Sequence, residues 1–184
     1  MKKIISALLI GFWGFNITNC LASEPQLSNY YSDLSGEHCI RTVLEEVTGS
    51  TADRCPGPSG YMLDVLYDDD RMSIDVITPS KQQASLNYWE IVSSGFSSID
   101  GQANWWLKTI NGKQQPVALI TPFVATENLE NGEDLTVTYQ VISKITDNEI
   151  CIIGKVEKTQ AQAESLITSL VNNADTKPCL SPKD

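Results

Sequence analysis

Few side chains of this chain could take part in covalent chemistry, and His38 is its only histidine. A Ser-His or Cys-His mechanism would therefore have to use His38. No Gly-x-Ser-x-Gly sequence is present, and the segment 57–60 (Gly-Pro-Ser-Gly) has a different spacing that predicts a turn. A single histidine also excludes a histidine-rich zinc site. We therefore predict no catalytic residue, no metal ligand and no cofactor.

Carboxylates offer a second route to chemistry. The adjacent aspartates 68–70 lack the spaced oxygens and the bidentate Glu of a calcium loop, so they predict a hairpin turn. Asp64, Asp75 and Glu90 could cluster as carboxylates suited to glycoside hydrolysis. The strand pattern places Asp64 and Asp75 opposite the apolar face, which predicts that both are solvated. A hydrolase that uses these carboxylates is the alternative to a protein without catalytic activity.

The start of the chain predicts export. A short basic segment, Met1-Lys2-Lys3, is followed by an uncharged apolar run over 4–15 and by small residues over 20–23. This pattern is typical of a bacterial secretory signal peptide over residues 1–23. It leaves residues 24–184 as a single disulfide-stabilised domain in the periplasm or outside the cell. Residues 17–20 resemble a lipoprotein cleavage box, so lipid attachment at Cys20 is the alternative.

The charge of the exported domain limits its partners. Without Lys2 and Lys3, the 13 basic residues fall to 11 against 23 acidic ones, a formal charge of −12. An acidic surface repels nucleic acid and anionic membranes and steers cationic partners. No segment after the signal approaches the ~20 apolar residues of a membrane-spanning helix. We expect a cationic protein or a cell-envelope component as partner, with no nucleic acid and no transmembrane segment.

The elements that position these residues are mainly predicted strands. Apolar and polar residues alternate in period two, and turns such as Asn111-Gly112 separate the runs. The predicted strands cover 61–67, 71–78, 103–110, 116–121, 134–145 and 150–156. Residues 85–92 predict a strand or a short helix, and residues 24–37 a loosely held arm.

One segment predicts a helix near the C-terminus. Thr159 is a suitable N-cap with Gln162 three residues later, and an apolar stripe at helical spacing follows over 163–174. The fold class is therefore α+β. We expect a curved antiparallel sheet of about six to seven strands, with the C-terminal helix packed on it and two disulfides.

Four cysteines remain after the signal, and an even number in an exported chain predicts disulfides. The expected helix returns ~22 Å along a strand that spans ~20 Å, which should bring Cys179 close to Cys151. Cys39 and Cys55 are close in sequence, and the chain between them can double back at Gly49. We therefore predict the pairs Cys39–Cys55 and Cys151–Cys179.

Two adjacent tryptophans, Trp105 and Trp106, face opposite sides of their predicted strand. One can enter the core, and the other is then half exposed or covered by the helix. Packing is the favoured interpretation for both, although an exposed Trp is typical of interfaces. With Trp89 they make residues 85–110 the most aromatic region and the first place to look for a contact.

A series of short motifs over residues 39–179 resembles a group of small exported bacterial proteins of unknown function. The resemblance implies a shared fold and no particular activity. The motifs are Cys39, Cys55-Pro56-Gly57, Gly60-Tyr61, Arg71, Trp106-x-Lys108, Pro116-x-Ala118-x-Ile120 and Cys151-x-x-Gly154-x-Val156.

A second resemblance covers about residues 55–110 and is to the membrane-bound C-type lysozyme inhibitors. The matching residues are Cys55, Leu63-x-x-Leu66-Tyr67, Ser94-Gly95 and Trp105-Trp106-x-Lys108. In that family the Ser-Gly loop and the Lys enter the cleft of the enzyme. Ser98 stands where the family has Tyr, and no Gly follows Lys108.

The resulting expectation is an exported, non-enzymatic binding protein, in its sharpest form an inhibitor of a cationic muramidase. Besides the hydrolase, a secreted host-directed factor is an alternative. The predicted binding residues are Ser94, Gly95, Trp105, Trp106 and Lys108.

Overall fold

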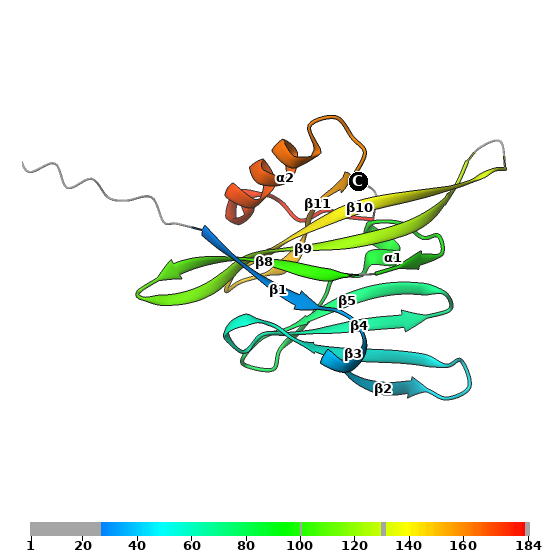
Figure 1. Ribbon diagram of the computed structural model, residues 1–184, viewed down its shortest axis with the longest axis horizontal. Coiled ribbons are helices and arrows are strands. Elements are labelled where there is room, and N and C mark those ends of the chain that lie inside the picture. Colours follow the sequence, from blue (N-terminus) through cyan, green and yellow to red (C-terminus); the bar gives the residue numbers. More distant parts are fainter. Residues whose placement is uncertain (1–26, 100, 130–131, 183–184) are drawn as a thin grey trace, which may run out of the picture.

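A computed structural model describes residues 27–99, 101–129 and 132–182, and within them two antiparallel sheets and a C-terminal helix (Figure 1). The signal peptide and Cys20 lie outside the described residues. The first sheet has the order β1 (Leu27–Asp33), β8 (Gln102–Ile110), β9 (Lys113–Asn128), β10 (Asp134–Ile145) and β11 (Ile150–Glu157), with β7 (Ser97–Ser98) paired to β9. The second has the order β2 (Ile40–Glu45), β3 (Ser50–Pro56), β4 (Met62–Asp68), β5 (Arg71–Ile77) and β6 (Gln83–Ser85).

The predicted α+β class, with antiparallel sheet, C-terminal helix and two disulfides, is confirmed, but the strands are more numerous. Eleven strands form two sheets rather than one sheet of six or seven. The helices are α1 (Tyr88–Ile91) and α2 (Ala163–Asn172), and short 3-10 turns cover Gly36–His38, Pro58–Gly60 and Ala174–Thr176. Within the described residues, no helix has the length and apolar character needed to span a membrane.

The two sheets pack face to face around one core. Period-two alternation directs one side of each strand inward, which is why side chains from both sheets meet there. The core includes Leu63, Val65, Ile74, Trp105, Leu119 and Val141. At one side β7 joins the two sheets, because it pairs with β9 and the amide of Ser97 donates to the carbonyl of Asp70 at 2.9 Å.

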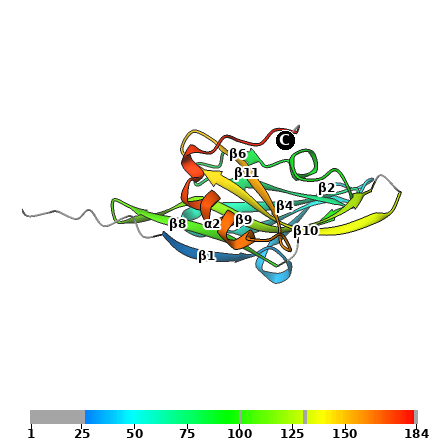
Figure 2. The ribbon, with the colours of Figure 1, turned by 90° about the horizontal axis from the view of Figure 1, so that it is seen from above.

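Helix α2 covers the outer face of the first sheet. Its buried residues Ile167 and Val171 pack against Ile142 and Ile153 in a second apolar cluster. Gly154 allows the close approach, because a Cβ there would lie 2.6 Å from a methyl carbon of Leu170. The molecule therefore has three layers, and the β8–β9 and β9–β10 hairpins project at opposite ends of an elongated shape (Figures 1 and 2).

Two local predictions were wrong, and one hairpin was not predicted. Residues 27–33 of the predicted arm form β1, which pairs with β8 from Leu27–Lys108 to Asp33–Gln102. The hairpin of β2 and β3 was not predicted. Helix α2 begins at Ala163, and Gln162 before it has a φ of 65°, so there is no capping box with Thr159.

Both predicted disulfides are confirmed, with Cα–Cα distances of 4.3 Å for Cys39–Cys55 and 5.6 Å for Cys151–Cys179. The second fixes the C-terminal segment to the first sheet. There the buried Lys144 donates to Glu149 at 2.5 Å and to the carbonyl of Lys177 at 2.8 Å. Two disulfides fit a protein of the periplasm or the extracellular space.

Candidate functional site

The two tryptophans face opposite sides of β8, as their adjacency predicts. Trp105 is fully buried, and its indole N–H donates to the hydroxyl of Ser32 at 3.0 Å. Trp106 is half-buried against the α2 cluster, and its indole nitrogen has no hydrogen-bond partner among the described residues. A side chain with 0 % exposure offers no surface contact, so Trp105 stabilises the core and does not belong to a binding surface.

The remaining predicted binding residues lie far apart. Gly95 is pressed against β9, because a Cβ there would lie 1.9 Å from the carbonyl oxygen of Thr126. Lys108 pairs with Gln115 on the same strand. The two points are separated by eleven residues of β9, or ~36 Å at 3.3 Å per residue. Ser94 and Gly95 therefore belong to one end of the molecule and Lys108 to the other.

Lys108 lines a groove of about 870 Å³ beside the projecting β8–β9 hairpin. Two lysines, Lys108 and Lys113, and two aspartates, Asp147 and Asp175, give it both signs of charge. Tyr61 also lines the groove, and burial, followed by the charge of Asp147, raises the pKa of its phenol.

The strand edge that opens into this groove is not suited to adding a strand. Residues 110 and 113 flank a two-residue turn and form a hydrogen-bonded pair, so Gln114 and Pro116 direct their backbone groups outward. Pro116 has no N–H, and the carbonyl of Gln114 already accepts from the hydroxyl of Ser59 at 2.7 Å. The groove therefore offers an extended peptide fewer backbone groups than a regular free edge would.

The opposite end is formed by the turns at 46–49 and 69–70 and the loop 94–96, and we call it the hairpin end (Figure 1). Hydrogen bonds of these segments and their flanking residues fix the segments to one another and to β9. The hydroxyl of Ser50 donates to Asp68 at 2.5 Å, and the amide of Thr126 donates to the carbonyl of Phe96 at 2.8 Å. The Ser97–Asp70 bond described above joins the second and third segments.

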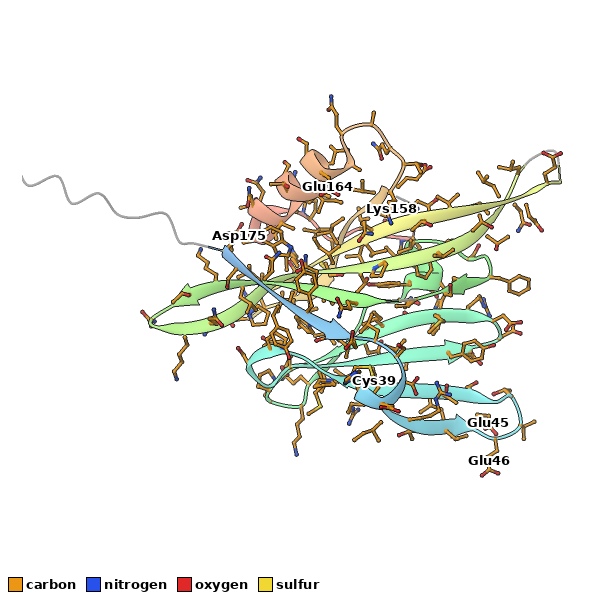
Figure 3. All side chains as sticks on the ribbon, viewed as in Figure 1. Cys39, Glu45, Glu46, Lys158, Glu164 and Asp175 are labelled. Atoms are coloured by element: carbon orange, nitrogen blue, oxygen red, sulfur yellow. A yellow bond between two sulfur atoms is a disulfide. The ribbon has the colours of Figure 1, made fainter. Side chains whose placement is uncertain are left out.

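The hairpin end is acidic. Figure 3 shows Glu45 and Glu46 at the tip of the β2–β3 hairpin, with Asp175 toward the other end. The turn at 68–70 adds three aspartates, and Arg71 is the one cation of these segments, with its guanidinium 3.5 Å from Asp69. The predicted hairpin turn is confirmed, because Asp69 and Asp70 have φ values of 49° and 56°.

Exposed apolar side chains lie among these carboxylates. Phe96 is 62 % exposed and Val47 is 92 % exposed. Tyr67 donates its hydroxyl to Asp70 at 2.5 Å, and this hydrogen bond is the main cause of the raised pKa of Tyr67. Aromatic side chains within a polar rim are typical of protein interfaces.

The carboxylates considered for hydrolysis are not solvated, so that prediction was wrong. Asp64 and Asp75 lie opposite each other on β4 and β5 and are 6 % and 3 % exposed. Arg54 donates twice to Asp64 at 2.7 Å, and Gln83 donates to one oxygen of Asp75 at 2.5 Å. Glu90 is exposed on α1 and is not part of this cluster's hydrogen bonds. The cross-strand partners therefore hold the pair as a structural element of the second sheet.

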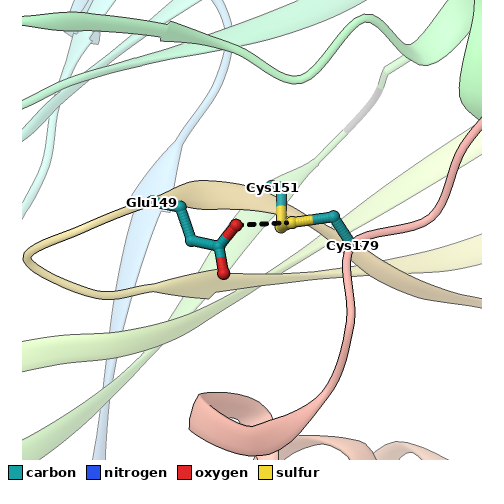
Figure 4. Close-up of side chains that lie close together, drawn as sticks. All are labelled: Glu149, Cys151 and Cys179. Carbon is teal, nitrogen blue, oxygen red and sulfur yellow. Dashed lines mark hydrogen bonds between the residues drawn. A yellow bond between two sulfur atoms is a disulfide. The ribbon is translucent and has the colours of Figure 1, made fainter.

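No other constellation of reactive groups is found in the described ranges. His38 is exposed, and its imidazole lies 3.5 Å from Asp33. Glu149, Cys151 and Cys179 have close ligand atoms, but both sulfurs belong to one disulfide and are not available to a metal ion (Figure 4).

Comparisons with protein-family models, with curated proteins and with solved structures gave no match.

Proposed function

We propose that this chain is an exported, non-enzymatic protein that binds a cationic protein through its hairpin end. The observation that carries the proposal is the pairing of exposed apolar side chains with carboxylates on one end. Phe96 supplies apolar area that water leaves on binding, and Glu45, Glu46 and Asp69 supply long-range attraction. The same surface suits a partner in the bacterial envelope or in a host, because both would be recognised by charge.

A cationic muramidase is the sharpest form of this proposal. Ser94 and Gly95 lie at the hairpin end, so a muramidase would meet the Ser-Gly loop there together with Phe96. Lys108, ~36 Å along β9, would not enter the same cleft. The contact would therefore differ from that of the lysozyme inhibitors, in which the loop and the Lys act together.

Two measurements test the muramidase form. One is the binding of the oxidised domain 24–184 to a C-type lysozyme, and the other is the lytic activity of that lysozyme with an equimolar amount of the domain. Asp69→Asn/Asp70→Asn removes two charges while keeping residues that tolerate positive φ. We expect the association rate at low salt to fall about three- to tenfold. Glu164→Gln/Asp175→Asn removes two charges from the α2 side and should leave the rate unchanged (Figure 3).

A separate variant tests the apolar contact of the hairpin end. Phe96→Ala should raise the dissociation rate with little change in the association rate, because it removes short-range contact only. Leu166→Ala on α2, another exposed apolar residue, is the matched control. Unchanged lysozyme activity at equimolar dose would exclude the muramidase form. The proposal as a whole fails if envelope or host proteins retained by the wild type are retained equally by both hairpin-end variants.

A further inference from the structure

Strand β2 is an open edge of the second sheet. All six of its residues are exposed, and Ile40 and Leu44 are 74 % and 58 % exposed. Of the other edges, β6 has three residues, and the carbonyl of Ile152 on β11 accepts from the amide of Leu180. The edge strand β1 has seven residues, and most of them are polar. A long edge with apolar side chains and no proline is a template for pairing with another strand.

The disulfide beside β2 identifies the backbone groups that face outward. The Cα atoms of Cys39 and Cys55 are 4.3 Å apart, which matches the ~4.5 Å spacing of a non-hydrogen-bonded pair. Up to the register shift between Val43 and Glu45, alternation then makes Arg41 and Val43 non-hydrogen-bonded toward β3, so their N–H and C=O groups point to the free edge. The same alternation continues through β4 to β5 and predicts that the carbonyl of Ile74 points toward β6. The amide of Leu86 does donate to this carbonyl, at 3.0 Å, which supports the assignment.

We propose that β2 pairs antiparallel with β2 of a second copy, about a twofold axis at Thr42. Arg41 of each copy would exchange both backbone hydrogen bonds with Val43 of the other. The axis brings Thr42 of one copy opposite Thr42 of the other. Ile40 of each copy then lies opposite Leu44 of the other copy. This β2–β2 pairing extends the five-stranded sheet across the dimer.

Self-complementarity is the reason to choose a second copy as the partner. Ile40, Thr42 and Leu44 lie on one face of β2, where they line a shallow hollow with Ala52 and Arg54. The residues two positions before and after Thr42, Ile40 and Leu44, are both apolar. The twofold operation therefore places apolar side chains against apolar side chains, as an isologous interface requires. The side chain of Arg41 is already neutralised by Asp53, with contacts of 2.7 and 2.6 Å, and adds no unpaired charge to the interface.

The β2–β2 pairing and the hairpin-end contact respond to salt in opposite directions. Two copies that each carry a formal charge of −12 repel, so screening by added salt strengthens the pairing. Screening weakens the attraction of the hairpin end for a cation. The two proposals therefore fail independently.

Cysteine cross-linking tests the register. Thr42→Cys places two thiols across the axis in a non-hydrogen-bonded pair, the geometry that already accommodates Cys39–Cys55. We expect mild oxidation of the folded domain to give a covalent dimer. Val43→Cys is the matched control, because its copies would lie diagonally, more than ~7 Å apart between Cα atoms. Faster cross-linking of Val43→Cys, or none of Thr42→Cys, would overturn the proposal.

Charge variants test the apolar contacts without oxidation. Sedimentation of the wild type should show a concentration-dependent dimer. Ile40→Glu/Leu44→Glu sets like charges against each other and should abolish this dimer. Mixing it with Ile40→Lys/Leu44→Lys should restore a heterodimer. Both side chains are more than half exposed, so the core is unaffected, and Leu135→Glu at another exposed site is the control. A wild type that stays monomeric up to ~1 mM, where even weak interfaces associate, contradicts the proposal.

Discussion

The two disulfides stabilise the fold by different routes, and removing each in turn separates these routes. Cys39–Cys55 joins residues 16 apart, and Cys151–Cys179 joins residues 28 apart. Restriction of the unfolded chain alone is worth about 3 kcal/mol for the shorter loop and about 3.5 kcal/mol for the longer. If loop length alone decided, loss of Cys151–Cys179 would lower the free energy of unfolding more than loss of Cys39–Cys55.

Burial reverses this order. Cys55 is fully buried in the core, and its replacement by Ala removes a buried group of about methylene size, worth ~1 kcal/mol. Cys179 is only half-buried, and two other contacts hold the same segment: Lys144 to the carbonyl of Lys177, and Leu180 to Ile152. We therefore expect Cys39→Ala/Cys55→Ala to cost about 4 kcal/mol and Cys151→Ala/Cys179→Ala about 3 kcal/mol or less.

Urea denaturation of the two variants and the wild type at pH 7 and 25 °C measures the difference. Hydrogen exchange at the amide of Leu180 adds a local readout, because release of the C-terminal segment should raise its exchange in the second variant only. A greater loss of unfolding free energy for Cys151→Ala/Cys179→Ala would refute the reasoning. It would mean that loop length outweighs burial and that the C-terminal contacts do not substitute for the bond.

Three further outcomes follow from single contacts. Gly95→Ala should lower the free energy of unfolding by about 1–3 kcal/mol in urea denaturation, because its Cβ would overlap a backbone carbonyl of β9. Ser94→Ala, at the exposed position before it, should leave the free energy of unfolding unchanged. Tyr88→Phe should cost about 1–2 kcal/mol by leaving Thr121 unpaired. It should not alter the absorbance titration of the folded protein, since burial raises the pKa of Tyr88 far above its ordinary value. Arg41 lowers the pKa of Asp53 below 3.8, so the pair stabilises the fold above pH 3.8 and loses this effect as the pH falls through the lower folded value. Asp53→Asn should accordingly lower the melting temperature at pH 7 and leave it unchanged near pH 2, and an equal decrease at both pH values would exclude a role for the charge.

The parts of the fold that the sequence predicts are those encoded locally. The turn at Asn111-Gly112 has φ values of 51° and 74°, as the dipeptide favours. Alternation identified β4, β5, β8 and β10 because each has one face on the core. The Cys151–Cys179 pairing followed from the lengths of one strand and one helix, and the Cys39–Cys55 pairing from closeness in sequence.

The parts that the sequence did not predict depend on distant partners. Strand β1 is polar and half-exposed, and it is a strand only because β8, some 70 residues later, offers a free edge. Strand β2 is exposed along its whole length, so it shows no alternation to detect. Asp64 and Asp75 do share the face opposite the core, as predicted, but their burial depends on Arg54 and Gln83 from neighbouring strands.

Net charge alone does not say where an acidic protein meets a cation, and the arrangement of the hairpins supplies that answer. Strand β9 links a groove with Lys108 and Lys113 to an end with Glu45 and Glu46, so the cationic partner that we propose would be oriented along the molecule as well as attracted to it. Strand β2 ends at Glu45, and in an antiparallel β2–β2 dimer the two hairpin ends point in opposite directions. Such a dimer would hold two cationic partners, or two sites of one large partner, at its two extremities. Its apparent affinity for a multivalent target should therefore rise with dimer formation, while its affinity for a single lysozyme molecule should not.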